Sequence, residues 1–123
     1  MTAKEANDRG QEALASERYE DAVRYFRQAV AEAPGWSVPL YNLGLTFKNT
    51  RDWQESRDAN LAAFRIEPED EATMWNLAIS AVAISDWDSA GQAFQAIGLQ
   101  LPDGPPPWDF QLGLIPIRLS PDD

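Results

Sequence analysis

The chain repeats itself every 34 residues, and this period limits its fold more than any other feature of the sequence. Several residue classes fall in register at that shift. The columns are Pro34, Pro68 and Pro102; Tyr19, Trp53 and Trp87; Gly10, Gly44 and Ala78; Ala22, Ser56 and Ala90; and Ala29, Ala63 and Ile97. A period of this length is typical of stacked supersecondary units, each of which buries its apolar face only against its neighbours. The sequence therefore predicts an array of three equivalent units.

Each unit has the pattern of two helices. Apolar side chains recur at helical spacing between Tyr19 and Val30, and each proline of the column disfavours helical geometry in the residue before it. Thr2 with Glu5, and Asp52 with Glu55, have the spacing of capping boxes. The small residues of two columns would let the paired helices approach closely. The predicted helices span residues 3–15, 19–33, 38–50, 53–66, 71–84 and 87–99.

These columns resemble the tetratricopeptide repeat. The first unit follows that pattern at Gly10, Tyr19, Ala22, Phe26, Ala29 and Pro34. The resemblance covers residues 3–104 and implies an all-α fold, a right-handed superhelix of three helix–turn–helix hairpins at about 3–36, 37–70 and 71–104. Two positions depart from the pattern. Asn60 stands where the other units have Phe26 and Phe94, and Arg9 stands in a column otherwise occupied by leucine, which indicates that the first helix lacks a neighbour on one side.

The pattern stops after residue 102, so the array is expected to occupy residues 1–102 and a tail residues 103–123. A run of three prolines cannot be helical and predicts an extended start to this tail. An apolar segment follows, containing Trp108, Phe110, Leu112 and Ile115. Two interpretations stay open: the tail folds back onto the array, on the end of the third unit around Phe94 and Ile97 or in the groove, or it leads into a further domain.

The composition argues against several function classes. The chain has no His and no Cys, which removes the commonest general base, the thiol nucleophile and the usual zinc ligands. We therefore expect no enzyme, no cofactor and no metal. The net charge is −10, and the acidic C-terminal part would repel phosphate, so nucleic acid and anionic membranes are poor partners. That charge is either a solubilising surface or a docking face for a basic partner. No apolar run is long enough to span a bilayer, and the first residues lack a signal peptide's apolar core, which predicts a cytoplasmic protein.

The resemblance implies that the first helix of each hairpin lines a concave groove. The groove residues that we expect from the matching positions are Asn7, Gln11, Tyr41, Asn42, Leu45, Trp75, Asn76 and Ile79. Some members of the family grip a terminal carboxylate with lysine and arginine, helped by asparagine. Asn42 matches one such asparagine, but the cation positions hold Asn7, Ala72 and Asn76. A carboxylate clamp is therefore not expected.

Two roles stay open for Asn42 and Asn76. An amide offers both a donor and an acceptor, so the pair could hold the backbone of an extended peptide, or it could join neighbouring helices. Tyr41 and Trp75 could give apolar contact in the groove or pack between repeats, whereas Trp53 and Trp87 are expected in the core.

The predicted function is a soluble module that binds a protein or peptide partner in a partly apolar groove. Two alternatives are an escort that shields an apolar client and the N-terminal scaffold part of a longer protein.

Overall fold

The computed structural model describes residues 1–98, 109–111 and 115–117. Six helices occupy the first of these ranges: α1 (Ala3–Ala15), α2 (Tyr19–Glu32), α3 (Ser37–Asn49), α4 (Trp53–Ile66), α5 (Glu71–Ala83) and α6 (Trp87–Ile97). Each begins and ends within two residues of the bounds predicted from the sequence. The hydrophobic periodicity and the prolines were therefore sufficient to locate every helix.

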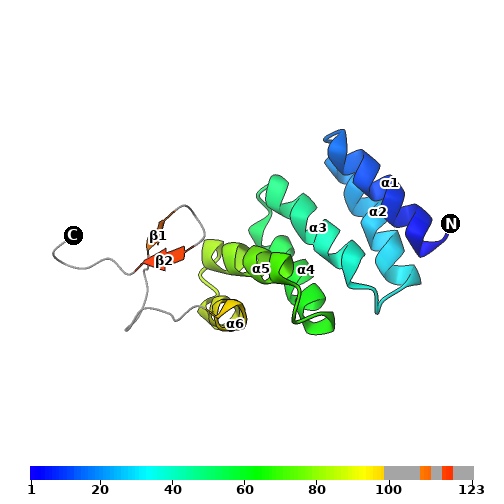
Figure 1. Ribbon diagram of the computed structural model, residues 1–123. Helices are drawn as coiled ribbons and strands as arrows, with labels where there is room; N and C mark the ends of the chain where they lie inside the picture. Colours follow the sequence, from blue (N-terminus) through cyan, green and yellow to red (C-terminus); the bar gives the residue numbers. More distant parts are fainter. Residues whose placement is uncertain (99–108, 112–114, 118–123) are drawn as a thin grey trace.

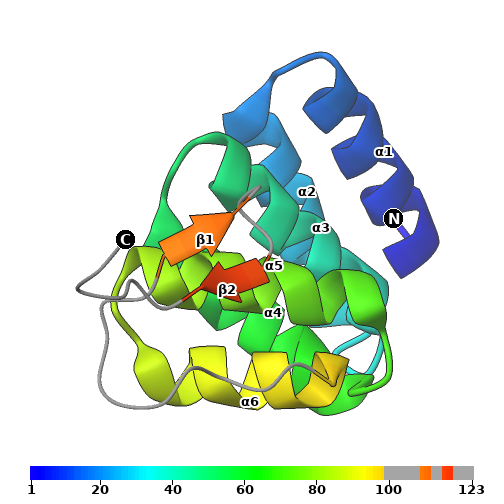
Figure 2. The same ribbon diagram turned by 60° about the vertical axis from the view of Figure 1, so that its left-hand side comes forward.

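The helices form three hairpins that stack in chain order. α1 packs on α2, α3 on α4 and α5 on α6, while α2–α3 and α4–α5 contacts join one hairpin to the next (Figure 1). The first helices of successive hairpins also touch, α1 with α3 and α3 with α5. A second view shows α1 at one end of this stack and α6 at the other (Figure 2). The predicted all-α solenoid is confirmed.

Two short strands lie beyond the helices. β1 (Asp109–Gln111) pairs antiparallel with β2 (Ile115–Ile117), and Phe110 stands opposite Pro116 in this ladder. An extended backbone was predicted for this part of the chain, although the pairing was not. The expected return of Trp108 and its apolar neighbours onto the array lies outside the described residues.

Small residues allow close approach inside the hairpins, as predicted. A Cβ atom added to Gly10 would lie 2.5 Å from Cε1 of Phe26, and one added to Gly44 would lie 2.7 Å from both amide atoms of Asn60. No real side chain tolerates such distances. The Asn60 side chain therefore occupies in the second hairpin the place that Phe26 occupies in the first.

The core is built from alanines around a few larger side chains. Phe26 and Phe94 are almost fully buried, at 0% and 1% exposure. The end of the third unit around Phe94 was expected to be open to the tail, and for Phe94 this was wrong: it lies inside the third hairpin, as Phe26 lies inside the first. The expectation that Trp53 and Trp87 belong to the core was also wrong, because both are half-buried. Arg9 is exposed, as its unusual column position indicated.

The helix ends follow the capping predictions in part. The Thr2–Glu5 capping box is present at the start of α1. Asp52 makes no side-chain cap on α4 and instead accepts a hydrogen bond from Oγ1 of Thr50 at 2.6 Å. Asp86 caps α6 by accepting from the backbone N–H of Ser89. The first turns are therefore stabilised by different local means in equivalent hairpins.

Candidate functional site

The predicted groove residues lie on α1, α3 and α5, the first helices of the three hairpins. Tyr41, Leu45, Trp75 and Ile79 are half-buried, so each presents apolar surface as well as packing against neighbours. Gln11 is exposed. The three asparagines are buried, with exposures of 4% for Asn7, 6% for Asn42 and 7% for Asn76. The face therefore combines partly accessible apolar groups with amides set deep between helices.

Asn42 joins α3 to α1. Its Nδ2 donates to Oδ1 of Asn7 at 3.0 Å, a buried hydrogen bond between two hairpins. A buried amide needs such a partner, because an unpaired polar group there costs free energy. The structure thus gives Asn42 the helix-joining contact that was one of its two open roles. Its Oδ1 makes no hydrogen bond with another described residue.

Asn76 has a corresponding contact one repeat later. Its Oδ1 accepts from Nζ of Lys48 at 3.2 Å, which joins α5 to α3. Within the described ranges its Nδ2 has no hydrogen-bond acceptor. In each of the two asparagines, one polar atom of the amide therefore bonds to a neighbouring helix. The other polar atom has no hydrogen-bond partner among the described residues.

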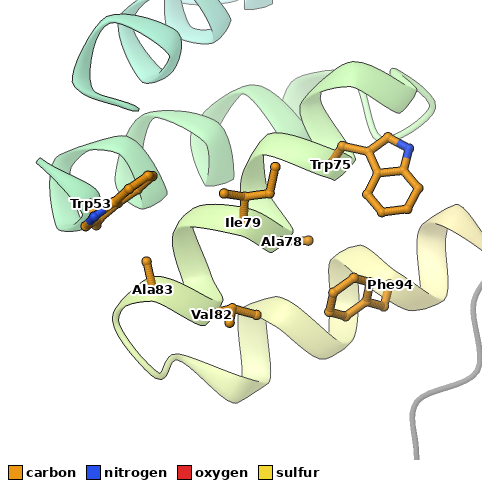
Figure 3. A pocket seen from close by; sticks show the side chains of 7 residues that line it. All are labelled: Trp53, Trp75, Ala78, Ile79, Val82, Ala83 and Phe94. Atoms are coloured by element: carbon orange, nitrogen blue, oxygen red, sulfur yellow. The ribbon is translucent and has the colours of Figure 1, made fainter. Parts of the chain in front are cut away.

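An apolar pocket opens on α5 and its neighbours. Its lining residues come from the start of α4, from one side of α5 and from α6: Trp53, Trp75, Ala78, Ile79, Val82, Ala83 and Phe94. Its volume is about 230 Å³. Trp53 and Trp75 stand on opposite sides of Ile79, with Phe94 below Trp75 (Figure 3). Two of the predicted groove residues, Trp75 and Ile79, thus meet in this pocket, whereas Tyr41 and Leu45 do not line it.

Sequence reasoning missed Trp53 and Ala83 as parts of this site. Trp53 shares a column with Tyr19 and Trp87, and an aromatic column was interpreted as core. All three of those aromatic side chains are in fact half-buried. Ala83, the last residue of α5, is exposed and lies one helical turn beyond Ile79. That spacing alone, four residues along a predicted groove helix, could have identified it.

The charged side chains of the third hairpin are all acidic between residues 69 and 98. Residues 69–98 carry five acidic side chains and no Lys or Arg. Arg57, which reaches this hairpin from α4, pairs with Asp86 and with Asp58. Hydrogen bonding with Ser89, assisted by Arg57, holds the pKa of the Asp86 carboxyl below its usual range, and Asp86 and Asp58 together raise the pKa of Arg57. Arg57, the cation by which α4 contacts the acidic third hairpin, is therefore already paired with carboxylates.

No group of side chains suited to a metal ion occurs in the described part of the chain. None of the helices there is both long and apolar enough to cross a membrane. The pocket lining is apolar throughout, and the amide of Asn76 lies on the same helix as Trp75 and Ile79.

Several solved structures share this fold, and one of them holds a bound peptide. The second tetratricopeptide domain of Spaghetti (RPAP3), bound to the HSP90 peptide SRMEEVD, is 15% identical, with a TM-score of 0.72 over 80% of this chain and 92% of that one. The TPR2B domain of yeast Sti1, in a pHsp70 complex, is 19% identical, with a TM-score of 0.69 over 76% and 75%. The MamA RS-1 ArsTM double mutant is 22% identical, with a TM-score of 0.71 over 78% of this chain and 54% of that one. No family model matches the sequence, and neither does any curated protein.

Proposed function

Because the chain has the tetratricopeptide-repeat fold, we propose that it is a protein-interaction module that binds a segment of another protein along α3 and α5. The observation that carries this proposal is the apolar pocket on α5, beside half-buried apolar residues of α3. Concave, mostly apolar sites with a few placed polar groups are typical of ligand binding. The proposal includes no catalytic residue, because the pocket lining contains no acid, base or nucleophile.

The two buried asparagines give this surface a way to hold a peptide backbone. Oδ1 of Asn42 could accept from a peptide N–H, and Nδ2 of Asn76 could donate to a peptide C=O. Their other ends are held by Asn7 and Lys48, which fixes the orientation of each amide before a ligand arrives. Such preorganisation reduces the entropy lost on binding. Tyr41, Leu45, Trp75 and Ile79 would supply the apolar contact, and Gln11 would extend the polar edge onto α1.

The two alternatives would use the same surface. An escort for an apolar client needs an apolar pocket, and the scaffold part of a longer cytoplasmic protein needs a partner site. Neither changes which residues are expected to bind.

The test compares two asparagines that share one hydrogen bond. Peptides are first selected from a random display library on the complete chain, and their affinity is then measured by fluorescence anisotropy. Asn42→Ala and Asn7→Ala both remove the bond between α1 and α3, but only Asn42→Ala also removes the acceptor offered to the peptide. We expect Asn42→Ala to weaken binding by about 1–3 kcal/mol. Asn7→Ala should lower the thermal midpoint and weaken binding less, because it leaves the Asn42 acceptor in place and removes only its fixed orientation.

Two results would contradict the proposal. A library that yields no binder would count against a module for linear segments. Equal binding losses in the two variants would mean that Asn42 acts only by joining helices.

A further inference from the structure

We propose that the pocket between Trp53 and Trp75 holds one large apolar side chain of a partner segment whose adjacent residues are Lys or Arg. This inference rests on the proposed function and adds the chemistry of the partner.

The pocket has the size and lining for one such side chain. Its volume is about 230 Å³. An apolar cavity of about 150 Å³ is enough to take up benzene, so a leucine or phenylalanine side chain fits. Every described lining residue is apolar, which means that a polar or charged group entering the pocket would lose its water without gaining a partner. The residue that enters is therefore apolar and large.

A carboxylate lies on α5 near the Trp75 side of the pocket. Glu71 precedes Trp75 by one helical turn, so the two side chains share a face of α5. Asp52, which immediately precedes Trp53, instead accepts a hydrogen bond from Thr50 and lines a separate pocket with Tyr19 and Phe47. Glu71 makes no ion pair within the described residues. Side chains that flank the bound apolar residue would therefore meet negative charge.

The cations near the pocket come from α3, α4 and the turn between them, and none comes from the third hairpin. Arg57 is paired with Asp86 and Asp58, whereas Lys48 donates only to the neutral amide of Asn76 and the exposed Arg51 makes no ion pair with a described residue. The third hairpin contributes no Lys or Arg between residues 69 and 98. The negative charge of this hairpin would therefore repel an acidic segment and attract a basic one.

The same charge argument disfavours the two occupants that this chain could itself supply. A second copy carries a net charge of −10. Residues 99–123 contain suitable aromatic side chains, but they carry four Asp against one Arg. Both would bring negative charge to a negative surface, which leaves a separate, basic partner as the complementary one.

The experiment uses the complete chain and three labelled peptides of the sequences SKKFKKS, SEEFEES and SKKSKKS. Binding is followed by the NMR signals of the Trp53 and Trp75 indole N–H groups and by anisotropy. We expect SKKFKKS to shift both indole signals and to bind at least about tenfold more tightly than the other two peptides. Raising the salt concentration from about 0.05 M to about 0.5 M should weaken the complex.

Two pairs of variants test the pocket and the charge separately. Ala83→Phe fills the pocket from an exposed position, and Ala31→Phe adds the same ring to an exposed position near the end of α2. Glu71→Lys reverses the charge beside Trp75, and Glu20→Lys makes the same change in the first turn of α2. We expect about tenfold weaker binding of SKKFKKS to Ala83→Phe, about threefold weaker binding to Glu71→Lys, and no change in either control. Circular dichroism checks that all four variants are folded.

Several outcomes would overturn the inference. Equal binding of SEEFEES would contradict the charge argument, and equal binding of SKKSKKS would show that the pocket is not used. Indole signals that change with protein concentration alone would assign the pocket to a second copy. If none of the probes shifts the Trp53 and Trp75 signals while library-selected peptides still bind the chain, this inference fails and the proposed function stands.

Discussion

Three turn residues offer a direct test of the architecture. Glu17, Arg51 and Ser85 occupy the same position in the three hairpins, between the first and second helix, with φ angles of 59°, 63° and 60°. These values lie in the left-handed region, which a residue with a Cβ adopts at a cost. All three side chains are exposed and make no hydrogen bond or ion pair with another described residue. Replacing them with glycine therefore removes strain without removing a contact.

The size of the effect follows from two opposing terms. A left-handed non-glycine residue costs about 1–2 kcal/mol. Glycine also has more conformational freedom in the unfolded chain, and losing it on folding destabilises the fold by about 0.5–1 kcal/mol. Each substitution should therefore stabilise the fold by about 0.5–1 kcal/mol, and since the turns share no contacts the three effects should add to about 2 kcal/mol. A midpoint increase of about 6–10 °C is expected for a chain of this size.

The assays are urea denaturation, which gives the free energy of unfolding, and thermal denaturation, which gives the midpoint, both followed by circular dichroism on the complete chain. The control is Gln28→Gly, at an exposed position in the interior of α2, where glycine should instead cost about 1 kcal/mol. If the triple glycine variant is less stable than the wild type, in the same direction as Gln28→Gly, the left-handed turns are not strained and the reasoning is wrong.

Three further predictions concern two core positions, Phe26 and Asn60, and the start of α6 at Asp86. Phe26→Ala should lower the free energy of unfolding by about 3–5 kcal/mol in urea denaturation, because the ring is fully buried against Gly10; a loss below about 1 kcal/mol would contradict that packing. Asn60→Leu should stabilise by about 1 kcal/mol in the same assay, because Oδ1 of Asn60 is buried without a partner among the described residues; lower stability would reveal an unrecognised polar partner. The pKa of Asp86 is lower in the folded than in the unfolded chain, so its ionised carboxylate stabilises the fold. This stabilisation is fully present above the unfolded pKa of about 3.9 and is lost as the pH falls through the pKa of the folded state. Asp86→Asn should therefore lower the thermal midpoint at neutral pH and differ less from the wild type near pH 2, and an equal difference at both pH values would refute this assignment.

The site was predictable in part, and the reason differs from residue to residue. The positions of Trp75 and Ile79 on a groove helix followed from matching them to the repeat, and both line the pocket. The place of Trp53 in the pocket lining could not be predicted, because a column of aromatic residues does not show how much of each side chain the neighbouring repeat covers. The partner of each asparagine also depended on helices that are distant in sequence: Asn42 bonds with a residue 35 positions away and Asn76 with one 28 positions away.

What the sequence by itself determined is the set of six helices and their pairing. Hydrophobic period, small residues opposite large ones and prolines at fixed spacing are local signals, and each acts within one repeat or across one hairpin. The left-handed turns carried no such signal, since Glu17, Arg51 and Ser85 are not residues that favour this conformation. They are held by the packing of two helices that must reverse direction in a short turn. Only the stacked structure decided how much of Trp53 stays accessible and where the pocket opens, because exposure depends on the surfaces that neighbouring repeats bring together.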